Sequence, residues 1–484
     1  MDDRNHNNTG HEKAHDPLHE MPIEAEVWGL PEDEPTIVRH DAESRIVRRT
    51  VFENITSNGT IAAAVMVFAA IAAVIMANSP AYDLIDDLNE LYLGIRIGDL
   101  AIGITLEEFV NDFLMFIFFL LVGVELKYEM TVGQLRKPRQ AALPMLAAVG
   151  GATVPCLIFL AINWGGAVSG WAIPMATDIA FALGVMSLLG DKVRPETKVF
   201  FQTLAIADDI LGILAIALFY GQAPSISWCG GIAACMVVLA LMNRANVMTV
   251  RPYAAVGFVM WVCFFNSGIH ATLAGVVLAF FLPVRSDIRV SRVSDWLSSQ
   301  ADKLDDRYDD KMHILGQHDF TETAHAMERV LHHVTPPLER VGRNISVLVN
   351  FVILPLFAFM NAQVRLVGAD FGALLLDPVT LGAFVGAVVG KPIGIVGVTW
   401  LLTRIGFSKL PHNMDWVQVI AVGLMGGLGF TMSILIAGLA FTDPSQVLAA
   451  KLAILLASVT SAVLGCAYLS FMTRVPAADD GEAA

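Results

Sequence analysis

The sequence carries few charged residues and few cysteines for its length. Only 16% of the 484 residues are Asp, Glu, Lys or Arg, while 55% are hydrophobic and the mean hydropathy is +0.60. A soluble domain of this size does not carry so much apolar sequence. The five cysteines fall in apolar segments at unpaired spacings, which excludes a disulfide framework and a cysteine-based metal site. These shortages favour a membrane protein over a soluble or disulfide-linked one.

Long apolar runs are what the sequence has in abundance. Runs of about 18 or more apolar residues can cross a bilayer as a helix, and they recur along most of the chain. We therefore expect an all-α polytopic membrane protein with twelve transmembrane helices, eight within residues 51–284 and four within residues 345–473. The expected spans are 58–78, 107–126, 141–163, 171–190, 197–220, 226–243, 252–265, 269–284, 346–366, 379–403, 416–441 and 447–473.

Basic residues are distributed unevenly between these spans. If the N-terminus is inside, the outer loops carry only Arg96 and Arg365, whereas the short inner loops carry eleven bases. The inner bases are Lys127, Arg136, Lys137, Arg139, Lys192, Arg194, Lys198, Arg244, Arg251, Arg404 and Lys409. Because inner loops of membrane proteins are enriched in Lys and Arg, we expect both termini in the cytoplasm and an even number of spans.

Several segments lie outside the expected spans. Residues 1–50 hold twelve acids and six bases and predict a disordered cytosolic tail, and residues 474–484 would form a short cytosolic C-terminal tail. Alternating apolar residues near residues 93–105 predict a small outer β-hairpin that turns at Gly98-Asp99. The charged segment 285–344 would be a cytosolic linker that is partly helical, and a solvated spacer is the alternative.

The spans contain a small set of titratable residues. A charge at the bilayer centre costs roughly 2.5–3.5 kcal/mol on insertion scales, so such residues usually line a wet cavity, pair with one another or carry ions. A single intramembrane Asp is often only a hydrogen-bond partner, but three Asp and one Lys deep in the spans of one molecule favour a functional role. The titratable residues of the spans are Asp112, Glu125, Asp178, Asp208, Asp209, His270, Lys391 and Lys451.

Two of these acids are adjacent in the run "FFQTLAIADDILGILAIALFY". Consecutive residues of a helix lie about 100° apart around its axis, so Asp208 and Asp209 cannot point to the same place. One can face a partner while the other faces an aqueous funnel. Lys391, in "GKPIGI", needs a carboxylate or must lose its proton, and either Asp208 or Asp209 could be its partner.

Two spans carry signs of an interrupted helix. In "WAIPMATDIAFALG", Pro174 removes a backbone donor, and Thr177 and Asp178 supply polar groups where backbone groups would be freed. In "VGLMGGLGFTMS", four glycines weaken the helix interior. Paired interruptions of this kind point to a transporter binding site, although close packing of helices through small residues is the alternative.

The motifs named so far resemble those of the bacterial NhaA family of sodium/proton antiporters. The segments that match are "NDFLMFIFFLLVGVELK", "GWAIPMATDIAFALGVMSLLG", "TLAIADDILGILAIALFY", "SGIHATLAGVVLAFFLP", "ILPLFAFMNA", "GKPIGI" and "GLGFTMSILIAGLAF". They occur in the order of the family and cover most of residues 58 to 470. The family is itself a known example of an inverted-repeat transporter, so the resemblance implies two inverted three-helix repeats, spans 3–5 and 10–12, with spans 4 and 11 crossing as broken helices.

The resemblance also implies roles for individual residues. Asp209 would be the principal sodium ligand, Asp208 would pair with Lys391, and Thr177 and Asp178 would lie beside this transient Na⁺ site. Glu125 and His270 match positions associated with the inner funnel and the pH response.

On the same basis we expect a secondary active transporter in the bacterial inner membrane that exchanges Na⁺ or Li⁺ for H⁺. It would be electrogenic, pH-regulated and not an enzyme. Its partners would be the lipid bilayer and a second copy bound through the outer hairpin. No cofactor and no nucleic acid are expected.

Some positions depart from the family pattern. Where relatives often have acidic and His-Pro residues before span 9, this chain has Gly342, Arg343 and Ser346, and Tyr128 replaces a frequent basic residue. These departures leave the pH set-point open. A channel, an intramembrane aspartyl hydrolase and a scaffold that only senses pH are the competing functions. The first would need a polar stripe through several spans, and the second would need its two Asp on different helices.

Overall fold

The computed structural model describes residues 59–97, 100–136, 138–221, 223–286, 288–368 and 370–472. The tails expected at residues 1–50 and 474–484, and the hairpin turn at Gly98-Asp99, lie outside these described residues. Within them the chain is mostly helical. Nine helices of this part are long and apolar enough to cross a membrane, and a bent pair of helices makes a tenth. The prediction of a polytopic, mainly α-helical membrane protein is confirmed.

Most of these helices are regular, and three contain a short π-helical segment. The uninterrupted ones are α3 (Gly59–Ala77), α7 (Pro138–Ile162), α9 (Pro195–Phe219), α10 (Ile226–Arg244) and α22 (Pro444–Met472). The others are α5 (Leu106–Glu108), η2 (Phe109–Leu114) and α6 (Met115–Thr131); α15 (Pro337–Leu348), η8 (Val349–Ile353) and α16 (Leu354–Asn361); and α18 (Pro378–Val385), η9 (Gly386–Gly390) and α19 (Lys391–Arg404). Such π segments often mark functional positions, and η9 ends directly before Lys391.

Both predicted interruptions are present. The first lies between the 3₁₀ helix η4 (Val168–Met175) and α8 (Ile179–Leu188), where Ala176 and Asp178 have extended backbone conformations. The second lies between α20 (Trp416–Gly426) and α21 (Phe430–Ala440), whose axes are bent by 41°. The proline and the glycines thus interrupt hydrogen bonding within the helices, as expected from their backbone properties.

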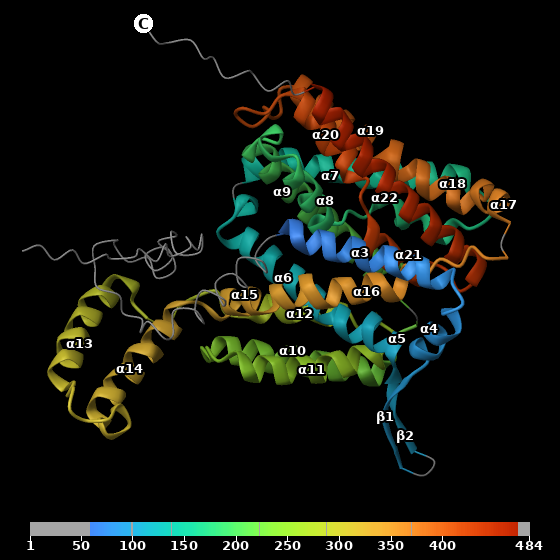
Figure 1. The fold of residues 1–484 in the computed structure, drawn as a ribbon. Helices are drawn as coiled ribbons and strands as arrows, with labels where there is room; N and C mark the ends of the chain where they lie inside the picture. Colours follow the sequence, from blue (N-terminus) through green and yellow to red (C-terminus); the bar gives the residue numbers. More distant parts are fainter. Residues whose placement is uncertain are drawn as a thin grey trace, which may run out of the picture. The chain divides into compact units, whose positions relative to one another are not determined.

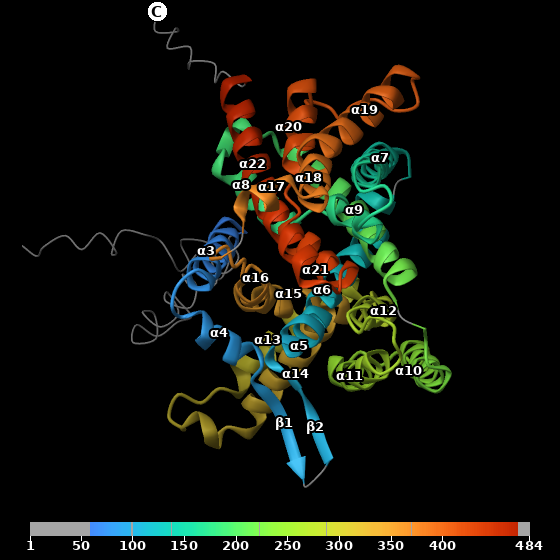
Figure 2. The ribbon, with the colours of Figure 1, turned by 90° about the vertical axis from the view of Figure 1, so that its right-hand side faces the viewer.

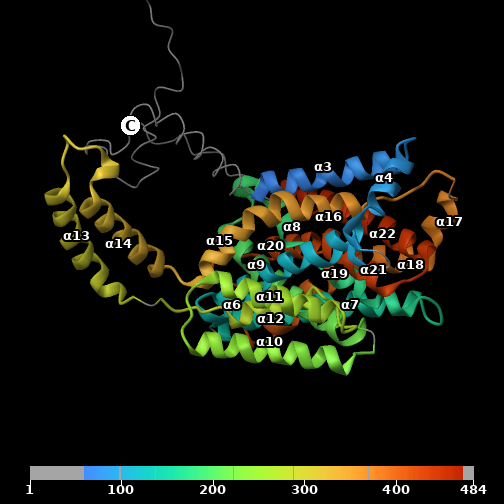
Figure 3. The ribbon, with the colours of Figure 1, turned by 90° about the horizontal axis from the view of Figure 1, so that it is seen from below.

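Two further helices are short. α11 (Val250–Phe265) has 16 residues and α12 (Leu273–Phe281) has nine, so neither is long enough by itself to count as a span. They pack beside α10 and α6, as Figure 3 shows from below. The count of twelve spans, and the inverted repeats, therefore remain predictions.

The predicted hairpin is confirmed. Strands β1 (Tyr92–Ile97) and β2 (Leu100–Thr105) form an antiparallel pair with Tyr92 opposite Thr105 and Ile97 opposite Leu100, and Figure 2 shows them side by side. Thr105 then caps the start of α5 with a capping box. The Thr105 hydroxyl accepts from the Glu108 N–H, and the Glu108 carboxylate accepts from the Thr105 N–H. This box stabilises the start of the helix that follows the hairpin.

The charged segment 285–344 contains helices that are joined by irregular segments. It contains α13 (Val293–Arg307) and α14 (His318–Val334), which pack on each other, and the next long helix begins at Pro337. Arg340 lies 2.7 Å from His332 Nδ1 and donates to the Met248 carbonyl at 2.7 Å. Desolvation, together with the charge of Arg340, lowers the pKa of His332, so this imidazole stays neutral beside the guanidinium at neutral pH.

Two groups of helices are visible in the ribbon. α7, α18, α19, α20 and α22 pack together in the upper part of Figures 1 and 2, and α6, α10, α11 and α12 pack together below them. Within the upper group, α7 and α19 approach each other closely at glycines. A Cβ atom on Gly394 would lie 2.1 Å from the Gly150 carbonyl oxygen, so only glycine allows the two backbones to touch.

We predict that Gly394→Ala destabilises the protein by about 1–3 kcal/mol, because the added methyl group must push two helix backbones apart. Thermal unfolding in detergent measures this change. Gly397→Ala is the matched control on the same helix, where a Cβ would meet no described atom within 4 Å. Equal stability of the two variants would contradict the prediction.

Candidate functional site

The two interrupted helices meet, and each satisfies backbone groups of the other. The Asp178 N–H donates to the Leu428 carbonyl at 2.6 Å, and the Thr177 hydroxyl oxygen lies 3.1 Å from the Gly426 carbonyl oxygen. Ser433 donates to the Ile173 carbonyl at 2.8 Å. Since free backbone groups cannot be hydrated inside a bilayer, irregular backbone there needs such protein partners. The interruptions therefore depend on each other.

Asp178 lies at the N-terminal ends of two of the half-helices. Its Oδ1 caps α8 by accepting from the Phe181 N–H at 3.0 Å. Its Oδ2 accepts from the Thr431 N–H at 3.2 Å and from the Thr431 hydroxyl at 2.6 Å, in the first turn of α21. Because a helix N-terminus carries a partial positive charge, the buried carboxylate and the two helix ends stabilise one another.

Lys391 occupies the opposite kind of position. Its side chain is fully buried, at 0% exposure. Its Nζ donates to the Met175 carbonyl at the C-terminal end of η4 and to Asp208 Oδ2 at 2.6 Å. A cation is favoured at a helix C-terminus, and the ion pair supplies the carboxylate that a buried ammonium requires. The sequence left two partners possible, and the structure brings Lys391 to Asp208.

The neighbouring carboxylates have different surroundings. Asp208 Oδ2 also accepts from the Thr177 hydroxyl at 2.7 Å, so this oxygen has two side-chain donors. By contrast, Asp208 Oδ1 and Asp209 Oδ1 are buried and have no hydrogen-bond partner within the described part of the chain. Buried acceptors without a donor are rare. Two of them on adjacent carboxylates are groups that could accept a proton or a cation.

Most of the charged groups that act on Asp209 are acidic. Its side chain is 5% exposed, and the groups that act on it electrostatically include Asp208, Asp178, Glu125 and Lys391. Three of these four are acids, so a cation or a proton near Asp209 would be held by several carboxylates at once. Asp208 is thus paired with Lys391, whereas no described residue donates to Asp209 Oδ1. That the second acid faces an aqueous funnel stays a prediction.

Two other predicted residues make no hydrogen bond to Asp208, Asp209 or Lys391 within the described part of the chain. Glu125 lies on α6 with its side chain exposed, and nearby Lys127 donates to carbonyls at the end of α12, on Phe280 and Leu282. His270 precedes the start of α12, and its Nε2 lies 2.7 Å from the Tyr220 carbonyl oxygen. Glu125 and His270 thus lie near opposite ends of α12, whose nine residues are about 14 Å long.

The departures from the family pattern lie on α6 and α15. Tyr128 is half exposed, and Gly342 brings α15 close to α6, because a Cβ there would lie 3.0 Å from Val124 Cγ1. Arg343 is exposed, and its carbonyl accepts from the Ser346 hydroxyl at 3.1 Å. Within the part of the chain that the structure describes, none of these four residues makes a hydrogen bond to the Asp208–Lys391 pair.

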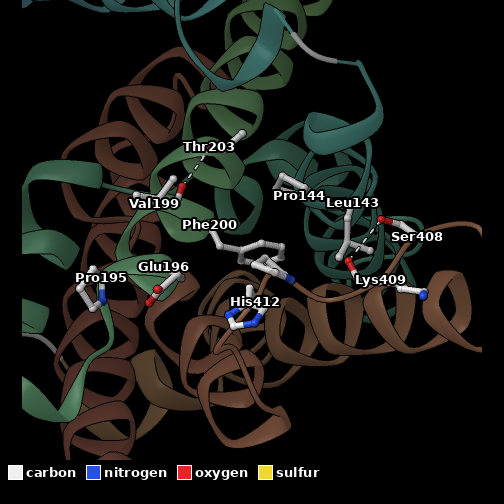
Figure 4. A pocket seen from close by; sticks show the side chains of 11 residues that line it. Leu143, Pro144, Pro195, Glu196, Val199, Phe200, Thr203, Ser408, Lys409 and His412 are labelled. Atoms are coloured by element: carbon white, nitrogen blue, oxygen red, sulfur yellow. Dashed lines mark hydrogen bonds between the residues drawn. The ribbon is translucent and has the colours of Figure 1, made fainter.

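A cavity of about 670 Å³ opens near the start of α9. Figure 4 shows Phe200 and His412 in it, with Glu196 and Thr203 contributed by α9. Thr203 precedes Asp208 by five residues, which is about 8 Å along a helix axis. Water that fills this cavity therefore comes within about two helical turns of the buried pair.

Several contributors to the site were missed by sequence reasoning. Thr431 and the carbonyl groups of Gly426 and Leu428 contact Thr177 and Asp178 from the other interruption, and the Met175 carbonyl accepts from Lys391. Carbonyl groups leave no mark in a sequence. Thr431 could have been found, because it follows the glycine run of span 11 as Thr177 follows Pro174 in span 4.

Comparison with known proteins gives a consistent result. A family model described as Na⁺/H⁺ antiporter 1 matches residues 53–469. A Na⁺/H⁺ antiporter NhaA of Dichelobacter nodosus is 38% identical over 86% of this chain and 90% of its own length. Proteins of the same name from Janthinobacterium sp. and Escherichia coli are 41% and 39% identical, each over 85% of this chain and over 90% and 95% of their lengths.

We predict that Lys391→Met destabilises the protein by about 3–5 kcal/mol, because it leaves the buried Asp208 carboxylate without its cation. Adding Asp208→Asn removes that charge, so the double variant should recover a large part of the loss. Lys409→Met, at an exposed lysine, is the control and should change stability by less than about 0.5 kcal/mol. Thermal unfolding of these variants, of Asp208→Asn alone and of the unmodified protein measures the coupling. Additive effects of the two site substitutions would contradict it.

Proposed function

The chain belongs to the Na⁺/H⁺ antiporter 1 family, and from this we propose that it exchanges sodium ions for protons across a bacterial inner membrane. In this proposal it is a secondary active transporter and not an enzyme. Its relatives are named for Na⁺/H⁺ antiport and come from bacteria. The long apolar helices of the described residues make it an integral membrane protein.

One observation carries the proposal. Asp209 lies next to Asp208, and each presents a buried oxygen that lacks a donor within the described residues, while Lys391 holds the other oxygen of Asp208. A carboxylate can hold a proton or help to coordinate Na⁺, but it cannot do both well. Burial favours its protonated form. Competition between proton and cation at these two oxygens is therefore the exchange step.

The proposed cation site consists of oxygen ligands, as hard cations require. Asp209 would be the principal ligand, with Asp208 and the Thr177 hydroxyl beside it. Asp178 would contribute mainly by its charge, because three donors already occupy its oxygens. Li⁺ has the same preference for oxygen and would use the same ligands.

The proposed cycle couples three groups. Protons from the outside load the carboxylates, and the higher pH inside releases them so that sodium binds. When Asp208 takes a proton its bond to Lys391 weakens, so the two groups titrate together. Alternating access would follow from movement of the interrupted helices, whose contacts to each other are hydrogen bonds rather than a continuous helix backbone. We infer that more protons enter than sodium ions leave, which makes the cycle electrogenic.

Regulation and assembly are also proposed. Glu125 and His270 would contribute to a pH response from the two ends of α12. A second copy would bind through the hairpin, where each strand has an edge that β1–β2 pairing leaves open. Both termini would be cytoplasmic, and spans 3–5 and 10–12 would be inverted repeats.

The competing functions fit the site less well. An aspartyl hydrolase needs two carboxylates that share one substrate, whereas Asp208 is engaged by Lys391 and Thr177. A channel needs a continuous polar path, and the Asp208–Lys391 pair is buried at 1% and 0% exposure. A scaffold that only senses pH has no use for a buried ion pair beside an unpaired carboxylate.

We predict that Asp209→Asn abolishes sodium-driven proton movement at every pH, because the amide can neither release a proton nor supply a charge to Na⁺. Everted vesicles with a dye that reports the pH gradient measure this movement. Asp87→Asn, at an exposed position on α4 (Tyr82–Asn89), is the control and should behave as the unmodified protein. If the double variant of Asp208 and Asp209 to Asn still exports sodium, the proposed function is wrong.

A second prediction concerns the voltage. If more protons enter than sodium ions leave, an inside-negative potential should speed sodium export from proteoliposomes in which potassium and valinomycin set the voltage. The rate of sodium flux at equal pH on both sides measures this dependence. A rate that does not change with voltage would show that the exchange is electroneutral.

A further inference from the structure

A basic pocket lies away from the buried carboxylates, where α6, α10 and α12 come together. It has a volume of about 630 Å³ and is lined by Lys127, Arg244 and Arg285, with the amide side chains of Asn243 and Asn246. None of the described residues that line it is acidic. Three bases without an acid form a site for an anion.

The pocket lies at the level where the apolar helices end. α10 ends at Arg244, α12 ends at Phe281, and Lys127 lies in the last two turns of α6. These helices pack side by side, as Figure 3 shows. The ends of transmembrane helices lie among the lipid headgroups, where anionic lipids attract Lys and Arg.

The surroundings of the pocket distinguish a lipid from a soluble anion. Only 17% of α10 is buried inside the protein, the lowest share among the nine apolar helices of the described part. Val237 and Leu241, on the turns that lead to Arg244, are 57% and 60% exposed. In a bilayer this helix faces acyl chains. An anionic group in the pocket would therefore lie directly beside the apolar side chains of α10.

The polar side chains are held in place by the protein. Lys127 Nζ donates to the carbonyls of Phe280 and Leu282 at 2.7 and 2.6 Å, which leaves one of its three N–H groups for a ligand. Asn243 donates to the Phe281 carbonyl at 2.6 Å. Arg244 and Arg285 are exposed, and a guanidinium group can bind two oxygens of one phosphate.

We propose that this pocket binds the phosphate of an anionic phospholipid, with the acyl chains along α10. Arg244 and Arg285 would bind the phosphate oxygens, and Lys127 would add a fixed positive charge. This lipid site is separate from the buried carboxylates and does not depend on the proposed exchange. Inorganic phosphate offers the same oxygens without the chains, so it serves as the probe for a soluble ligand.

The test uses the full chain, purified in a neutral detergent. Binding of phosphatidylglycerol, phosphatidylcholine and inorganic phosphate is measured by native mass spectrometry and by the shift in unfolding temperature. We expect phosphatidylglycerol to bind at least tenfold more tightly than phosphatidylcholine. The double variant Arg244→Gln with Arg285→Gln should lose at least tenfold of that affinity. Lys127 is left unchanged because it also binds the end of α12.

The matched control is Arg404→Gln with Lys409→Gln, which removes two positive charges from another predicted inner loop. This pair should change phosphatidylglycerol binding by less than twofold. An equal loss in both double variants would show only a general attraction to surface charge and would overturn the proposal. Tight binding of inorganic phosphate with no preference between the two lipids would overturn the assignment to lipid.

If the double glutamine variant does not fold, a second double variant tests the same site. Arg244→Lys with Arg285→Lys keeps both charges and should retain most of the affinity while losing the paired oxygen contacts of the guanidinium groups. Unchanged selectivity for phosphatidylglycerol in a folded glutamine variant would also overturn the site. Sodium/proton exchange is assayed on the same proteins, so loss of lipid binding with intact exchange separates this proposal from the proposed function.

Discussion

A buried ion pair between Lys391 and Asp208 is the interaction on which the rest of the site depends. Both side chains are almost completely inaccessible, and burying two charges is unfavourable unless each finds close partners. Asp208 receives Lys391 and Thr177 on one oxygen, and Lys391 also binds the Met175 carbonyl. That carbonyl and that hydroxyl lie at the end of η4, so the pair requires a helix that stops inside the membrane.

An interrupted helix creates partial charges where it stops, and the fold arranges them to fit the buried groups. The C-terminal end of η4 faces the ammonium of Lys391, while the N-terminal ends of α8 and α21 face the carboxylate of Asp178. Each helix end is favoured by the charge opposite to its own. The close approach of α7 and α19 through Gly150 and Gly394 holds the helix that carries Lys391. The site is thus built by backbone as much as by side chains.

Much of this arrangement could be predicted from the sequence, and what could not has a physical reason. Pro174 and the glycine run interrupt helices by local backbone properties, and the hairpin and the apolar helices follow from local periodicity. The choice of Asp208 rather than Asp209 for Lys391 depends on how α9 is rotated, and adjacent acids carry no mark of that rotation. Thr431 reaches Asp178 across 253 positions of the chain, a contact that only the packed fold determines. The short α12 shows why apolar runs alone do not fix the number of spans, since nine residues cannot cross a bilayer unaided.

The difference between the two adjacent acids explains why both are needed in the proposed cycle. If both carboxylates were paired with cationic side chains, a sodium ion would find no free oxygen. If neither were paired, two negative charges would be buried together with only helix ends to offset them, which is more costly than one. One paired and one unpaired carboxylate keep the buried charge tolerable and leave an acceptor open. If Asp208 takes a proton in the proposed cycle, Lys391 loses the opposite charge that it pairs with, so the pair would stay neutral only if the ammonium gives up its own proton in the same step.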